Sequence, residues 1–154
     1  MKNTFNEALI APCGMNCGIC SGYLAKKYDI RSKGVRMTYC AGCRPRDKQC
    51  AFLKKRCETL LNGQVQYCYE CESYPCERLR HIDKRYFLSQ FRMSMIENLQ
   101  YIKKHGIKKF LEKEEEKWRC PECGGVICCH NGICFNCGLE KLKKKKNKYR
   151  WDDE

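Results

Sequence analysis

Three cysteines near the start of the chain have a spacing suited to an iron-sulfur cluster. Cys13, Cys17 and Cys20 lie in the stretch CGMNCGIC, where a glycine follows each of the first two. Three such thiolates can hold a four-iron cluster, and the glycines let backbone amides approach its sulfides. A cluster with only three protein ligands keeps one iron open for a substrate. The stretch therefore indicates a metal site, with iron-sulfur chemistry as one alternative.

Radical enzymes use the same cysteine spacing, but on a barrel of eight strand-helix units. Such a barrel needs roughly 200 residues or more, and this chain has 154. The length of the chain therefore excludes a radical enzyme.

The clearest metal-ligand pattern lies near the C-terminus, in WRCPECGGVICCHNGICFNCG. It contains two C-x-x-C pairs, Cys120/Cys123 and Cys134/Cys137, and glycine follows each pair. Two such pairs at the ends of short strands clamp one zinc ion in a zinc ribbon. The spacing predicts a ribbon over residues 118–138.

Between these pairs lie Cys128, Cys129 and His130. They could form a second partial metal site or a reactive thiol pair, or they could be small residues on a short hairpin. The hairpin interpretation is favoured because a ribbon needs only four ligands.

The first 88 residues hold ten further candidate ligands, which are Cys13, Cys17, Cys20, Cys40, Cys43, Cys50, Cys57, Cys68, Cys71 and Cys76. Their partition stays open. The C-x-x-C pairs Cys40/Cys43 and Cys68/Cys71 make one natural four-thiolate site. The first three cysteines would then take a fourth ligand from Cys50, Cys57 or Cys76, or keep an open position.

A different partition resembles the first half of the fungal binuclear zinc cluster, which binds DNA. Cys40, Cys43, Cys50 and Cys57 and the basic loop RPRDK match its first half. That cluster needs a second C-x-x-C beginning at Cys57, where this chain reads CETL. The DNA-binding cluster is therefore disfavoured.

The composition explains why metal is expected at all. Leu, Ile, Val and Phe make up about 19% of the chain, while 16 residues are cysteine. Aliphatic burial alone is then insufficient, and disulfides or thiolate-bound metal must add stability. The N-terminal sequence has no apolar run of signal-peptide length, and no stretch approaches 18 apolar residues, so we expect a cytoplasmic protein with reduced thiols and no membrane partner.

The elements that position these cysteines are predicted to be mainly helical. Periodic apolar residues indicate short helices in 21–30 and 49–63 and another that begins after Tyr74-Pro75. A helical connector is expected over 89–117, with a break at His105-Gly106. We expect an α+β fold, with a cysteine-rich domain over 1–88, the connector, the ribbon over 118–138 and a disordered basic tail over 139–154.

The first segment resembles a known family. The blocks IAPCGMNCGICSGYLAKK, YCAGCRP, CAFLKKRC and YCYECESYPCERL occur in the order found in the cysteine-rich domain of unknown function 3795. The resemblance covers about residues 8–88, and some members continue into a C-terminal CPxCGG ribbon. It implies metal binding and assigns no activity.

Three functions follow as hypotheses. The favoured one is a binding module for protein or RNA, stabilised by several thiolate sites that hold zinc. The second is a nucleic-acid-binding protein, because KLKKKKNKYR carries seven of the charges behind the net +13 and is followed by Trp151. The third is an iron-sulfur enzyme that uses Cys13, Cys17 and Cys20. The chain shows no other catalytic motif, so a non-enzymatic role is favoured.

Overall fold

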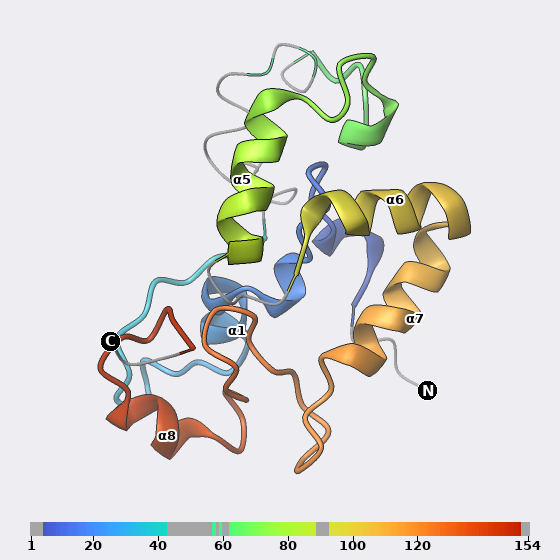
Figure 1. Cartoon of the computed structure of the whole chain (residues 1–154). Helices are drawn as coiled ribbons and strands as arrows, with labels where there is room; N and C mark the ends of the chain where they lie inside the picture. The colour runs from blue at the N-terminus through green and yellow to red at the C-terminus, as the bar shows by residue number, and fades with distance from the viewer. Residues whose placement is uncertain (1–4, 43–56, 58, 60–61, 89–92, 152–154) are drawn as a thin grey trace.

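The computed structural model of the chain describes residues 5–42, 57, 59, 62–88 and 93–151 (Figure 1). Within these ranges the chain is mainly helical. The α-helices are α1 (Ser21–Lys27), α5 (Glu77–Leu88), α6 (Met95–His105), α7 (Ile107–Lys117) and α8 (Leu139–Lys144), and the 3-10 turns are η1 (Glu7–Leu9), η2 (Cys17–Ile19) and η3 (Cys68–Glu70). None of the described helices is long and apolar enough to cross a membrane.

Strand pairing is sparse in the described part of the chain. It consists of three isolated antiparallel bridges, Ile10 with Asn16, Arg119 with Val126 and Ile127 with Cys134. The expected α+β class is therefore not confirmed. In the C-terminal segment the chain turns directly between the bridge partners, where the Gly124 amide donates to the Cys120 carbonyl and the Gly132 amide donates to the Cys128 carbonyl.

The helices begin and end close to where the sequence predicted. α1 follows Cys20, and α5 begins two residues after Pro75. The connector forms α6 and α7, which are separated by Gly106 at a φ of 91°, a backbone conformation that glycine adopts without strain. The predicted helix over 49–63 falls mostly outside the described residues.

The core joins the N-terminal cysteine segment to α6 and α7. The Asn98 side chain on α6 donates a hydrogen bond to the Gly14 carbonyl at 2.9 Å, and the fully buried Leu99 and Phe110 extend the same packing. Buried cysteines contribute to this core, and Cys128 and Cys129 are both 0% exposed. Thiol side chains thus supply part of the apolar volume that aliphatic residues lack.

Residues 139–151, which belong to the predicted basic tail, include α8 and pack against the rest of the chain. Leu142 on α8 is fully buried, and the Trp151 indole donates a hydrogen bond to the Cys129 carbonyl at 2.7 Å. The Asn131 side chain donates to the Lys148 carbonyl at 2.7 Å. Through Trp151 and Lys148, the lysine-rich segment contacts residues 129–132.

Candidate metal centre

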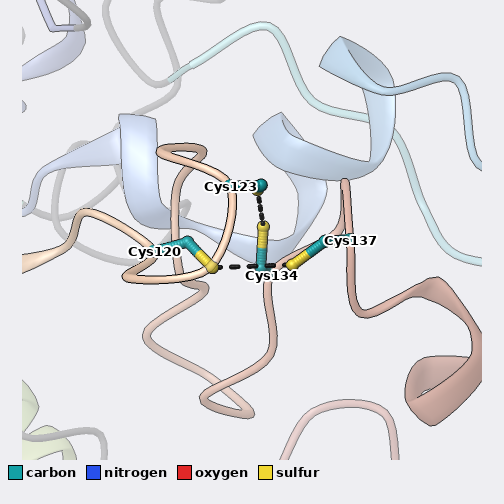
Figure 2. Close-up of side chains that lie close together, drawn as sticks. All are labelled: Cys120, Cys123, Cys134 and Cys137. Carbon is teal, nitrogen blue, oxygen red and sulfur yellow. Dashed lines mark hydrogen bonds between the residues drawn. The ribbon is translucent and has the colours of Figure 1, made fainter.

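Four cysteine side chains converge in the C-terminal segment. The Sγ atoms of Cys120, Cys123, Cys134 and Cys137 all lie within 4.8 Å of one another. Figure 2 shows the side chains pointing toward a common point. The Sγ atoms of Cys120 and Cys137 lie 3.6 Å apart, and those of Cys123 and Cys134 lie 3.5 Å apart. These are the four residues that the two C-x-x-C pairs predicted.

Tight backbone turns bring each pair together. The Cys120 amide donates to the Gly125 carbonyl at 2.7 Å, and the Gly124 amide donates back to the Cys120 carbonyl at 2.9 Å. In the second pair the Gly138 amide donates to the Cys134 carbonyl at 2.8 Å. A side chain at Gly138 would lie 2.7 Å from that carbonyl oxygen, so the glycine after the second pair is needed for close backbone approach.

The sulfur separations fit a zinc ion. Zinc binds thiolates at about 2.3 Å in a tetrahedron, which places neighbouring sulfurs roughly 3.8 Å apart. The observed contacts of 3.5 and 3.6 Å are slightly shorter than this edge. Small movements of the thiols would bring these separations to the length that a zinc tetrahedron requires.

The site favours thiolate at Cys123. The Gly125 amide and then the Asn136 side-chain amide, both at 3.4 Å from the sulfur, lower the pKa of Cys123 to about 6. Cys137 behaves oppositely, because hydrogen bonds with Cys120 and Cys123 raise its pKa to about 12. Without a cation, neighbouring sulfurs cannot all be anionic, so metal binding must release protons.

Tyr28, which the sequence did not single out, borders this site from the end of α1. A side chain at Gly125 would meet the Tyr28 hydroxyl at 3.3 Å and the sulfurs of Cys123 and Cys134 at 3.2 Å. Burial raises the pKa of Tyr28, and the nearby cysteines raise it further. The N-terminal half of the chain thus supplies a wall of the C-terminal metal centre.

Two of the first three N-terminal cysteines approach different sets of thiols. Cys13 neighbours Cys68, whose pKa is raised first by burial and then by Cys13, Cys76, Cys57 and Cys71. Cys20 instead neighbours the C-terminal thiols Cys128 and Cys129. Cys17 is buried in the core, and the Cys40 amide donates a hydrogen bond to the Gly22 carbonyl at 3.0 Å.

Among the described residues, Cys13, Cys17 and Cys20 do not form a compact ligand group like that of the C-terminal site. Cys43 and Cys50 lie outside the described residues, so the predicted pairing of Cys40/Cys43 with Cys68/Cys71 stays a prediction.

His130 and its two cysteine neighbours lie at the junction of the two halves. The Ser21 amide, at the start of α1, donates to His130 Nδ1 at 3.2 Å, and the Cys129 sulfur lies 3.7 Å from the same nitrogen. The Cys129 amide donates to the Ile19 carbonyl at 2.9 Å. Burial raises the pKa of Cys128 to about 12, which opposes the thiolate that a reactive pair would need.

The stability of the protein is expected to fall in mild acid because of His130. Burial lowers its pKa from 6.5 to about 4, so between these values the unfolded chain binds a proton that the folded chain does not. Stability rises with pH under that condition. The contribution of His130 is complete above pH 6.5, and about 3 kcal/mol of it is lost as the pH falls toward 4. Urea unfolding at several pH values measures this loss.

The control separates this effect from the release of metal by acid. His130→Gln and His81→Gln, a substitution at an exposed histidine, are compared with the wild type at equal metal content. The slope of unfolding free energy against pH should become smaller in His130→Gln alone. Equal slopes in all three proteins would contradict the prediction.

The fold and site thus define a mainly helical, cysteine-rich protein with a four-cysteine group able to bind a metal ion. A family model described as a protein of unknown function, DUF3795, matches residues 9–81. This match lies within the predicted range of about 8–88, and it does not reach the C-terminal cysteines. No curated protein and no solved structure matches the chain.

Proposed function

We propose that this chain is a zinc-binding protein in which Cys120, Cys123, Cys134 and Cys137 hold a structural ion in a ribbon-type site. The observation that carries the proposal is the approach of four sulfurs to within 4.8 Å of one another. Four thiolates fill the coordination sphere of zinc and leave no open position for a substrate. The site then stabilises the chain, and the protein acts as a binding module.

In this proposal, the metal holds two neighbouring parts of the chain in position. One is the C-terminal segment itself, and the other is α1, because Tyr28 borders the cysteines and Ser21 contacts His130. A bound zinc ion would hold both segments in register, so that a partner meets a rigid surface. Pre-organisation of this kind lowers the entropic cost of binding.

Metal analysis of protein purified without oxygen tests the proposal. We expect at least one zinc per chain, and a loss of one zinc in Cys120→Ser. The variant Asn136→Ala, which removes only a hydrogen bond to Cys123 at 3.4 Å, should retain the ion. A brown protein that loses iron and acid-labile sulfide in Cys120→Ser would instead assign an iron-sulfur centre to these four residues.

A second candidate function, binding of RNA, is favoured by one surface feature. Tyr149 is 44% exposed and lines an open hollow together with Arg31, Arg36, Met37 and Thr38. Arg31 is already held in place, because its Nε donates to the Met37 carbonyl at 2.9 Å. An exposed aromatic ring beside two arginines is suited to stacking on a base while the cations contact phosphates.

Point substitutions test RNA binding better than removal of the tail, because Leu142 and Trp151 belong to the fold. We expect Tyr149→Ala to weaken binding of a single-stranded RNA by about 5- to 100-fold. Arg36→Ala should weaken it for all sequences and reduce the dependence of log affinity on log salt by about one. Fluorescence anisotropy at several salt concentrations measures both effects.

Lys108→Ala on α7 is the matched control, because it also removes one exposed positive charge but lies outside the hollow. If all three variants bind RNA as the wild type does, or if all weaken binding equally, the hollow is not the binding site.

A further inference from the structure

A second group of cysteines lines one small cavity at the start of α5. The lining residues are Cys57, Thr59, Val65, Cys68, Cys71, Tyr74, Cys76 and Leu79. Four of these eight side chains end in sulfur, and none of the four forms a disulfide. Apolar groups make up most of the remaining wall, so the sulfurs are its main potential ligands for a soft metal.

Local backbone structure fixes the positions of three of these cysteines, Cys68, Cys71 and Cys76. In the η3 turn the Cys71 amide donates to the Cys68 carbonyl at 3.1 Å, and the Tyr74 amide donates to the Cys71 carbonyl at 3.1 Å. Cys76 directly precedes α5, and its carbonyl accepts the Arg80 amide at 3.0 Å. Consecutive turns followed by a helix start therefore hold these positions as the turns of a metal-binding knuckle would.

Hydrogen bonds hold both ends of the η3 turn. The Glu70 carboxylate accepts the Tyr67 amide at 2.9 Å, and the Cys68 amide donates to the Pro12 carbonyl at 2.8 Å. This second bond ties the cavity to the beginning of CGMNCGIC and brings Cys13 next to Cys68. Cys13 is fully buried but is not among the residues that line the cavity.

Tyr74 provides an independent indication of a ligand. Its hydroxyl is buried and has no hydrogen-bond partner among the described residues, although its side chain lines the cavity. Buried polar groups are rarely left unsatisfied. A metal-bound thiolate in the cavity would give this hydroxyl an acceptor, because metal ligands commonly accept or donate hydrogen bonds to groups around the site.

We propose that Cys57, Cys68, Cys71 and Cys76 bind a second thiophilic metal centre, separate from the C-terminal one. This inference rests on the proposed function, because it extends thiolate metal binding from the C-terminal segment to the N-terminal half of the chain. In the part of the chain that the structure describes, only the C-terminal cysteines have all sulfurs within 4.8 Å. Metal binding therefore draws the four sulfurs of the cavity inward, whereas the C-terminal site is already closed.

This partition differs from the pairing of Cys40/Cys43 with Cys68/Cys71, which was one of the partitions that the sequence left open. Cys68 and Cys71 take their partners from Cys57 and Cys76, which are close along the chain, rather than from Cys40 and Cys43. Cys13 becomes a buried neighbour of the centre instead of a ligand.

Metal counting on single variants tests the inference. Anaerobically purified wild-type protein should hold two metal centres, and Cys71→Ser and Cys76→Ser should each hold one fewer. Cys13→Ala should keep both, because it removes a nearby sulfur that does not line the cavity. Cys120→Ser should lose the C-terminal centre only. Zinc, or iron with equimolar sulfide, identifies the metal that the Cys71 and Cys76 variants lose.

A second measurement uses the wild-type chain, so it tests the inference even if the cysteine variants fail to fold. In metal-loaded protein, alkylation followed by mass spectrometry should find Cys57, Cys68, Cys71 and Cys76 protected, and a chelator should raise their alkylation rates at least tenfold. Unchanged rates, together with unchanged metal content in the variants, would overturn the inference. That outcome would not contradict the proposed C-terminal site, because the metal content of Cys120→Ser tests that site separately.

Discussion

Replacing Cys134 by alanine is expected to remove one zinc ion per chain and to lower the melting temperature by more than 10 °C. Structural zinc contributes about 10–16 kcal/mol of apparent binding free energy in zinc-finger peptides, which is comparable to the whole stability of a typical domain. Cys134 is 6% exposed and pairs with Ile127 in one of the three bridges. Loss of this ligand therefore removes the metal and frees the turn that Gly138 closes.

Cys128→Ala is the matched control for this substitution. Cys128 is 0% exposed and lies on the same hairpin, so it tests the loss of a buried sulfur that is not a ligand of the C-terminal site. We expect this variant to keep its zinc and to melt only a few degrees below the wild type. Calorimetry and metal analysis on both variants provide the comparison. The structural role of zinc would be refuted if Cys134→Ala kept its zinc, or if both variants melted at the same temperature.

The second large effect is expected at Gly14, within CGMNCGIC. Gly14 has a φ of 90°, and a side chain there would lie 2.5 Å from the Met95 carbonyl oxygen and 2.9 Å from Leu99 Cγ. Gly14→Ala combines left-handed backbone strain of about 1–2 kcal/mol with overpacking of about 1–3 kcal/mol. We expect a loss of about 3 kcal/mol in unfolding free energy, measured by urea titration.

Gly34→Ala separates these two causes. Gly34 has a φ of 92°, but nothing lies within 4 Å of the position its side chain would take. This variant should therefore show only the strain, at about 1–2 kcal/mol. Equal losses at Gly14 and Gly34 would mean that contact with α6 contributes nothing.

The role of Gly14 also changes the interpretation of the stretch CGMNCGIC. The glycines of this stretch were expected to let backbone amides approach the sulfides of an iron-sulfur cluster. At Gly14 the structure shows a different requirement, because the missing side chain leaves room for α6 and for the hydrogen bond from Asn98 to the Gly14 carbonyl. At least one glycine in CGMNCGIC is thus explained by packing.

The elements that the sequence predicted well are those governed by neighbours along the chain. The break at Gly106 follows from the conformation of one glycine, and the start of α5 follows from the turn before it. The four C-terminal ligands were also predictable, because each C-x-x-C pair is closed by its own turn and the two pairs are only ten residues apart. The α+β class was not confirmed, because single bridges replace the expected strands.

Sequence by itself determined which residues can bind metal, since thiol chemistry and C-x-x-C turns are local properties. Only the tertiary structure decided which cysteines meet. It placed Cys13 beside Cys68 and Cys20 beside Cys128, and it folded the lysine-rich tail onto the core through Leu142 and Trp151. These contacts depend on the packing of segments that are distant along the chain, and the spacing of the cysteines does not predict that packing.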